Sequence, residues 1–154
     1  MCELYKNQLI TIRVTSGNIF YGPMKVMYQT FYDRVIEVFY NGEWFPAKII
    51  GKASVKEMYQ VNRNLTCSAD LKLKTPSGIK DINNFLSDMN TDIRKICLNT
   101  NECRKITSVN LDHDEHIDDI EFLNEKSDWL FGVKFEDPKN QYYTLTDGYI
   151  VSVF

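Results

Sequence analysis

The sequence predicts an all-β domain with one minor helical element, and three observations support this expectation. Short runs of β-branched and aromatic residues recur along the 154-residue chain, and turn-forming residues separate them. The pair Asn41-Gly42 lies between two aromatic-rich runs, and both residues accept the positive φ of a type I′ hairpin turn. One segment, about 82–97, has apolar residues at helical spacing. Many short strands and little helix are typical of a domain built on sheets.

The first half of the chain contains runs that are rich in Val, Ile, Tyr, Phe and Met, most of which favour strands. Turn signals such as Ser16-Gly17-Asn18 and Asn41-Gly42 separate these runs. We expect strands at 8–14, 24–31, 34–40, 44–50, 57–61 and 71–75.

The helical element is expected across about 82–97. Its apolar residues fall near the spacing that places side chains on one face of a helix. These residues are Ile82, Phe85, Leu86, Met89, Ile93, Ile96 and Cys97. Asp81 precedes the first of them and is available as a helix cap. The pattern predicts one helix or two short ones.

Strand-like runs resume in the second half of the chain. We expect strands at 105–111, 117–123, 129–135, 142–146 and 149–154. No segment repeats at a fixed period, and a chain of this length most simply forms one domain, spanning 1–154.

Composition excludes several classes of protein. A net charge of −3 provides no basic stripe, which argues against a dedicated nucleic-acid binder. Neither a signal peptide nor a membrane-spanning run is present, so we expect a cytoplasmic location and no membrane partner. The four cysteines show no CxxC spacing, so we expect free thiols.

The stretch "DHDEHIDDIE" at 112–121 gathers His113 and His116 with six carboxylates. Such side chains are able to bind a divalent transition metal, which would suit a metal-dependent nuclease. A hydrated acidic loop is the simpler interpretation, and an acidic contact surface for a basic partner is another. We therefore expect no metal and no cofactor, and keep the nuclease as an alternative.

Four stretches, taken in order, resemble the conserved blocks of inteins, the self-excising elements of the Hint (hedgehog/intein) family. The first two are "CELYKNQLITIRVTSGNIFYGPMKVMY" at 2–28 and "YNGEWFPAKIIGKASVKEMYQV" at 40–61. The others are "LTCSADLKLKTPSGIKDINNF" at 65–85 and "WLFGVKFEDPKNQYYTLTDGYIVSVF" at 129–154. The resemblance covers essentially the whole chain. It implies a compact, horseshoe-shaped all-β fold whose two ends meet in the middle.

The resemblance assigns roles to the residues that correspond to those that carry out the first step of splicing in inteins. An intein begins with a Cys or Ser that attacks the preceding carbonyl, and Cys2 occupies that position. A Thr and a His of the central block polarise and protonate the scissile amide, and here Ser68 and Leu71 stand in their places. Serine is still able to donate a hydrogen bond, but leucine cannot protonate anything.

The closing block departs further from the family pattern. Gly132 stands where an acid or Cys assists the middle steps, and Asn140 stands where a His does so. Val153 and Phe154 replace the final His-Asn pair, whose Asn cyclises to release the downstream segment. A benzyl side chain has no nucleophile, so the resemblance implies that this cleavage is lost.

From these departures we expect a standalone intein-like module that has lost protein splicing and binds a protein partner, in the manner of a phage accessory protein. One alternative is a self-processing domain that keeps the Cys2 thioester step; an intein whose ends were altered by design is another explanation of the departures. We also expect Val153 and Phe154 to pack near Cys2 and Leu71, where the lost chemistry once occurred.

Overall fold

The computed structural model describes residues 2–87, 92–100, 106–117 and 119–154, with the side chains of 92–100, 106–116 and 124–128 left out. Its strands are β1 (Leu9–Arg13), β2 (Ile19–Pro23), β3 (Ile36–Tyr40), β4 (Glu43–Val61), β5 (Leu65–Ser68), β6 (Lys72–Thr75), β7 (Gly78–Asp81), β8 (Asp92–Thr100), β9 (Ile106–His116), β10 (Ile120–Phe135), β11 (Tyr142–Thr144) and β12 (Ile150–Ser152). Its helices are α1 (Met24–Thr30) and α2 (Ile82–Ser87). The all-β expectation is confirmed.

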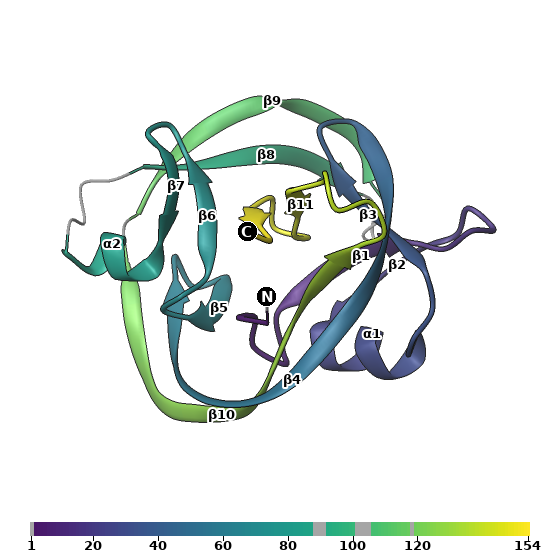
Figure 1. Cartoon of the computed structure of the whole chain (residues 1–154). Coiled ribbons are helices and arrows are strands. Elements are labelled where there is room, and N and C mark those ends of the chain that lie inside the picture. Colours follow the sequence, from purple (N-terminus) through teal and green to yellow (C-terminus); the bar gives the residue numbers. More distant parts are fainter. Residues whose placement is uncertain (1, 88–91, 101–105, 118) are drawn as a thin grey trace.

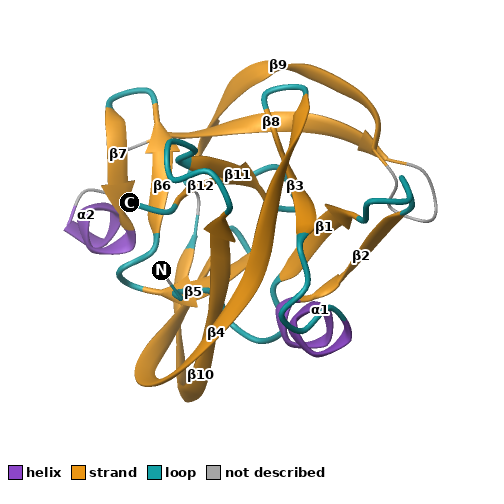
Figure 2. Cartoon of the chain, turned by 45° about the vertical axis from the view of Figure 1, so that its right-hand side comes forward, coloured by secondary structure: helices purple, strands orange, loops and turns teal. Residues whose placement is uncertain are grey.

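Within the described residues the strands form three sheets. The largest has the order β10-β4-β3-β1-β2, with β5 also paired to β4. The second has the order β11-β12-β6-β7, and the third is the β8-β9 pair. The strand pairings of the described residues are all antiparallel, as expected for a chain rich in hairpins. Figure 2 shows how the strands wrap around one another.

The long strands draw a ring around both ends of the chain. In Figure 1 β4 and β10 curve along the bottom of the view and β8 and β9 along the top, while the N- and C-terminal ends lie between them. β4 and β10 pair along most of their length, from Ile120↔Val61 to Phe135↔Ala47. The N-terminal and C-terminal segments therefore both lie inside the ring that the long strands form.

The hairpin predicted at Asn41-Gly42 is confirmed. Tyr40 pairs with Glu43 across the turn, and φ is 51° at Asn41 and 84° at Gly42. These angles match the left-handed turn that joins right-twisted antiparallel strands.

The strand predicted at 24–31 is wrong, because most of this segment forms helix α1. Pro23 stands in the N-cap position with extended backbone, and Met24 and Met27 are buried one turn apart. Tertiary packing on that face outweighed the β-propensity of the segment. The helical spacing of Met24, Met27 and Tyr28 was the signal that the strand interpretation missed.

The helix predicted across 82–97 is correct only at its start. α2 ends at Ser87, and Asp92–Thr100 is strand β8, paired with β9. Asp81 does cap α2: its carboxylate accepts from the Asn84 N–H at 3.0 Å, and the Asn84 side chain accepts from the Asp81 N–H at 3.1 Å. This reciprocal pair is a capping box that uses Asn. Pairing with β9, a segment outside the predicted helix, makes the second half of that helix a strand.

Some runs that were predicted as separate strands belong to one longer strand in the structure. The runs expected at 44–50 and 57–61 lie in one strand, β4, and the run at 129–135 joins most of 117–123 in β10. The acidic stretch 112–121, interpreted as a loop, has strand backbone up to His116. β2, β5 and β7 were not predicted, because they are short and only partly apolar.

One large cluster of buried apolar residues holds the sheets together. It includes Ile10 of β1, Val38 of β3, Leu73 of β6, Val133 of β10 and Val151 of β12, each no more than 2% exposed. No helix in the described residues is long and apolar enough to cross a membrane.

Candidate functional site

The segment after Cys2 is held between β5 and β10. The N–H and C=O of Leu4 exchange hydrogen bonds with the C=O and N–H of Phe131, both at 2.9 Å. On the other side, the Ser68 N–H donates to the Glu3 carbonyl oxygen at 2.9 Å, and the Tyr5 N–H donates to the Thr66 carbonyl oxygen at 3.2 Å. This ladder brings the start of the chain to the end of β5, where Ser68 lies.

Cys2 is half-buried beside a small apolar cluster of Tyr5, Met58 and Leu130. Burial raises the pKa of the Cys2 thiol above its ordinary value, and the Glu3 carboxylate raises it further, while Lys52 acts in the opposite direction. The thiolate is the nucleophilic form of cysteine. The surroundings of Cys2 therefore disfavour the form that attacks carbonyls.

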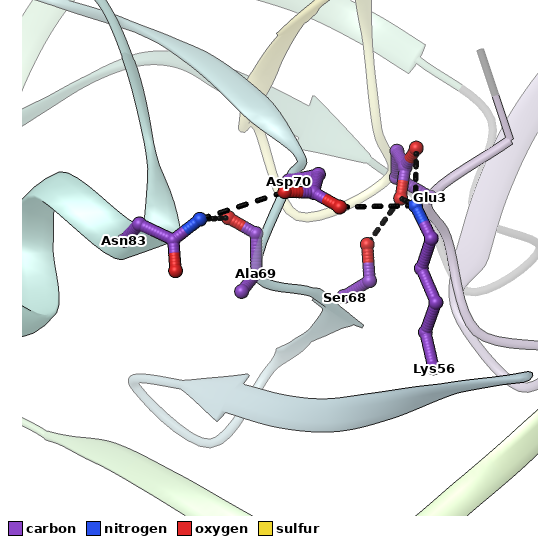
Figure 3. A network of polar contacts seen from close by, with 6 residues as sticks. All are labelled: Glu3, Lys56, Ser68, Ala69, Asp70 and Asn83. Atoms are coloured by element: carbon purple, nitrogen blue, oxygen red, sulfur yellow. Dashed lines mark hydrogen bonds and ion pairs between the residues drawn. The ribbon is translucent and has the colours of Figure 1, made fainter.

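The hydroxyl of Ser68 donates a hydrogen bond to the Glu3 carboxylate (Figure 3). Ser68 is 1% exposed and the Glu3 side chain 12% exposed, so this bond lies away from water. Lys56 Nζ lies 3.0 Å from Glu3 Oε2 and also 3.0 Å from Asp70 Oδ2. One ammonium thus bridges two carboxylates, one of which already holds the Ser68 hydroxyl.

The charge of Lys56 is stabilised by this arrangement. Burial lowers the pKa of Lys56, but its hydrogen bonds with Asp70 and Glu3 outweigh burial, and the net pKa shift is upward. Asn83 extends the network, because its amide donates to the Ala69 carbonyl oxygen at 3.3 Å and to Asp70 Oδ1 at 3.5 Å (Figure 3). The network joins the N-terminal segment, β4 and the start of α2.

Leu71 follows Ser68 by one turn of chain and lies in the main apolar core. Its N–H donates to the Ser68 carbonyl oxygen at 3.3 Å, and its side chain is 3% exposed. The position to which the resemblance assigns a proton donor is therefore filled by packed aliphatic carbon.

The closing segment runs beside the central block. β12 pairs with β6 at Val151↔Leu73 and with β11 at Tyr143↔Val151. Tyr143 is fully buried, and burial first, then the nearby Cys2 thiol, raises the pKa of its phenol. The Thr146 and Thr11 hydroxyls share a buried hydrogen bond of 2.9 Å, which ties the closing segment to β1.

The remaining positions assigned by the resemblance are not all gathered here. Gly132 is buried in β10, next to Phe131 and paired with Ile50 of β4. Asn140 lies apart, in the lining of a surface pocket with Tyr40 and Tyr142. Its N–H donates to the Asp137 carbonyl oxygen at 3.1 Å, which is a turn contact.

The last two residues, both expected near Cys2 and Leu71, differ in their burial. Val153 is partly buried against the core cluster that contains Leu71, and its N–H donates to the Gln141 carbonyl oxygen at 2.8 Å. Phe154 is 54% exposed, so the expectation that it fills the space near Cys2 and Leu71 is wrong. Tyr143 and Val151 are among the buried side chains of the closing segment, whereas Phe154 is not.

The metal alternative rests on His113 and His116, whose side chains lie outside the described part of the chain. Their backbones belong to β9 and pair with Lys95 and Asp92. Among the described side chains, no group of three or more His, Cys, Asp or Glu is arranged to hold a metal ion. Cys2 and Cys67 are free thiols, as expected.

Sequence reasoning missed the most prominent polar residues of the site, Glu3, Lys56 and Asp70. Glu3 follows directly after Cys2, which was a signal that it lies near the site. Its partner Lys56 is 53 residues away, and no local pattern links the two.

Comparison with known proteins identifies the fold. No family model and no curated protein matches the chain. Solved structures do match over nearly its whole length, including a variant of the Ssp DnaB mini-intein (11% identity, TM-score 0.64, covering 97% of this chain and 93% of that one). The transcription factor IIB Mvu mini-intein matches with 10% identity and a TM-score of 0.65, covering 99% of both chains. The gp41-1 intein matches with 15% identity and a TM-score of 0.54, covering 98% of this chain and 96% of that one.

These likenesses at low identity extend over nearly the whole chain, which has both of its ends inside a ring of long strands (Figure 1). The chain therefore has the intein-like Hint fold.

Proposed function

We propose that this Hint domain has lost protein-splicing chemistry and acts as a protein-binding module. The observation that carries the proposal is at the central block: the Ser68 hydroxyl donates to the Glu3 carboxylate, and Leu71 is packed into the apolar core. Activation of the amide before Cys2 requires a donor to its carbonyl oxygen and an acid for its nitrogen. Neither is offered here.

The Ser68 proton is committed to a strong acceptor. A bond from a hydroxyl to a carboxylate is charge-assisted and is about twice as strong as a bond between neutral groups. To polarise a scissile carbonyl, Ser68 would have to break its hydrogen bond to Glu3, and a hydrogen bond to a charged group contributes about 1.5–3 kcal/mol. The ion pair with Lys56 holds the Glu3 carboxylate beside Ser68.

The nucleophile and the closing residues support the same proposal. Burial raises the pKa of the Cys2 thiol, which lowers the thiolate fraction near neutral pH. Val153 and Phe154 carry neither an imidazole nor a carboxamide, so cyclisation at these positions has no nucleophile. We infer that the fold was retained for a use other than self-excision.

A binding role fits the surface of the described residues. Several large apolar side chains are exposed, among them Tyr32 at 64% and Trp129 at 44%. Exposed aromatic residues are enriched where proteins contact partners. In this proposal the domain acts in the cytoplasm of a bacterial host as a phage-encoded accessory protein, a setting that rests on the resemblance to inteins alone.

The loss of chemistry is tested by fusing a folded reporter ahead of Cys2 and adding a strong thiol. We expect the wild-type fusion to stay intact, because no thioester forms for the thiol to cleave. A splicing-competent mini-intein in the same fusion is the positive control. Release of the reporter from the wild-type chain, absent in Cys2→Ala, would overturn the proposal in favour of the self-processing alternative.

The binding role is tested by immobilising the full chain and capturing partners from a bacterial lysate, with soluble chain as competitor. We expect one partner whose capture saturates and is competed away. If no saturable partner is recovered, the binding half of the proposal fails even when the reporter stays intact.

A further inference from the structure

A pocket of about 350 Å³ is lined by residues of helix α1 and strand β10 and by Lys6. Its lining consists of Lys6, Lys25, Tyr28, Gln29, Trp129 and Phe131. This volume is within the range of pockets that hold a few side chains or a small ligand. The pocket therefore combines two cationic side chains with three aromatic rings.

The aromatic wall is preorganised by contacts within the protein. The ring centre of Tyr28 lies 5.4 Å from that of Phe131, 6.5 Å from that of Trp129 and 5.4 Å from that of Tyr32. Gly51 makes room for them, since a Cβ at this position would lie 3.1 Å from the Phe131 ring and 3.3 Å from that of Tyr28. A rigid apolar wall costs little entropy on binding.

The two lysines lie side by side at this pocket. The Lys25 N–H donates to the Lys6 carbonyl oxygen at 3.1 Å, so the two backbones are adjacent, and both residues are exposed. In the described part of the chain, the ion pairs use Arg13, Lys48 and Lys56, and neither pocket lysine takes part. On a molecule of net charge −3, this is a local positive site without an internal counter-charge among the described residues.

The apolar surface continues beyond the pocket. Tyr32, 64% exposed, stacks edge-on against Tyr28, and Trp129 is 44% exposed. A small anion would leave these rings in water, whereas a polypeptide segment would cover them while its carboxylates meet the lysines. Buried aromatic anchors surrounded by polar contacts are typical of such interfaces.

We propose that the pocket of Lys6, Lys25, Tyr28 and Trp129 binds an acidic peptide segment of the partner, with a large apolar side chain between or beside its Asp or Glu residues. The inference rests on the proposed binding function and names its surface and the chemistry of the partner. Carboxylates pair with the two ammonium groups, and the apolar side chain packs on the aromatic wall.

The test is a selection of random short peptides displayed on phage against the purified full chain. We expect the enriched peptides to share at least two acidic residues next to one Trp, Phe or Leu. The consensus peptide is then synthesised, and its dissociation constant is measured by fluorescence polarisation at low and high salt. We expect affinity to fall about tenfold or more at high salt, because exposed charge pairs are screened.

Charge reversal identifies the surface. We expect Lys6→Glu with Lys25→Glu to abolish binding of the consensus peptide, and Lys6→Arg with Lys25→Arg to retain it. Lys139→Glu is the matched control, because Lys139 is exposed and lines a different pocket, and it should bind like the wild type. Trp129→Ala should weaken binding with little change in its salt dependence. Thermal unfolding verifies that each variant is folded.

The proposal is overturned if the enriched peptides are basic or lack acidic residues, if no consensus emerges, or if the charge-reversed variant binds as tightly as the wild type. Insensitivity of wild-type binding to salt also contradicts it, and this measurement does not depend on any variant. Capture of the saturable lysate partner by the charge-reversed variant would refute this surface while leaving the proposed binding function intact. Thiol-dependent reporter release would overturn the proposed loss of splicing chemistry without bearing on this surface.

Discussion

At the scale of single residues, Cys67 and Tyr143 each bury an ionisable side chain in the described part of the protein. Cys67 is 0% exposed and Tyr143 is 1% exposed. Burial raises the pKa of both the Cys67 thiol and the Tyr143 phenol far above their ordinary values of 9.0 and 10.0. Both groups therefore stay neutral in the folded chain under conditions where the unfolded chain ionises.

This difference predicts that stability falls as the pH rises above about 9. Below that pH both groups are protonated in the folded and the unfolded chain, and their contribution is constant. Above it the unfolded chain releases protons that the folded chain keeps, so the free energy of unfolding decreases. Urea unfolding between pH 7 and 10.5 measures this, and Cys67→Ala should flatten the first part of the decline. A free energy of unfolding that is constant up to pH 10.5 would contradict the prediction.

Two aromatic residues near the C-terminal strand should differ sharply in their contribution to stability. Tyr149 is fully buried and its hydroxyl donates to the Asn64 side chain, whereas Phe154 is 54% exposed. We expect Tyr149→Ala to lower the free energy of unfolding by about 3–5 kcal/mol, because it removes a core ring. Phe154→Ala should change it by less than about 0.5 kcal/mol. Equal effects in a denaturant titration would show that Phe154 is buried after all.

At the scale of elements, hairpins and caps depend on neighbouring residues and were predicted well. The Asn41-Gly42 turn and the cap at Asp81 both appear where the sequence placed them. Helix α1 and strand β8 were missed, since the partners that decide them lie elsewhere in the chain: β8 pairs with β9, and the buried face of α1 packs on the core. The apolar residues of these segments fit neither the helical nor the strand period alone, so their sequence is compatible with a helix or a strand.

The capping box of α2 offers a test at this scale. Asp81→Ala removes the acceptor for the Asn84 N–H, and α2 is only six residues long. We expect a loss of about 1 kcal/mol of stability, typical of an N-cap. Asp81→Ser, which keeps an acceptor, should recover most of it. Thermal unfolding followed by circular dichroism compares the three chains, and an unchanged midpoint for Asp81→Ala would contradict the role of the cap.

At the scale of the whole molecule, the decisive contacts join distant parts of the chain. Leu4 is hydrogen-bonded to Phe131, β12 pairs with β6, and β10 pairs with β4. Forming such pairs requires large loops to close before any contact is gained. The molecule therefore folds only when its two ends come together.

This topology predicts slow folding. We expect a folding time of milliseconds to seconds, typical of chains dominated by non-local strand pairs. Stopped-flow refolding by tryptophan fluorescence measures it, with Trp44 and Trp129 as the probes. A dominant phase in the microsecond range would count against the prediction.

The sequence alone determined the fold class, the hairpin at Asn41-Gly42, and the side chains at the positions that the intein resemblance assigns. Turn preference and side-chain chemistry belong to a residue and its neighbours, so they can be inferred locally: the side chain of Leu71 has no acidic proton in any fold. The tertiary structure alone decided that Ser68 donates to Glu3, that Lys56 bridges Glu3 and Asp70, and that Phe154 is exposed. These outcomes depend on which distant segments meet, and that is set by the packing of the complete chain.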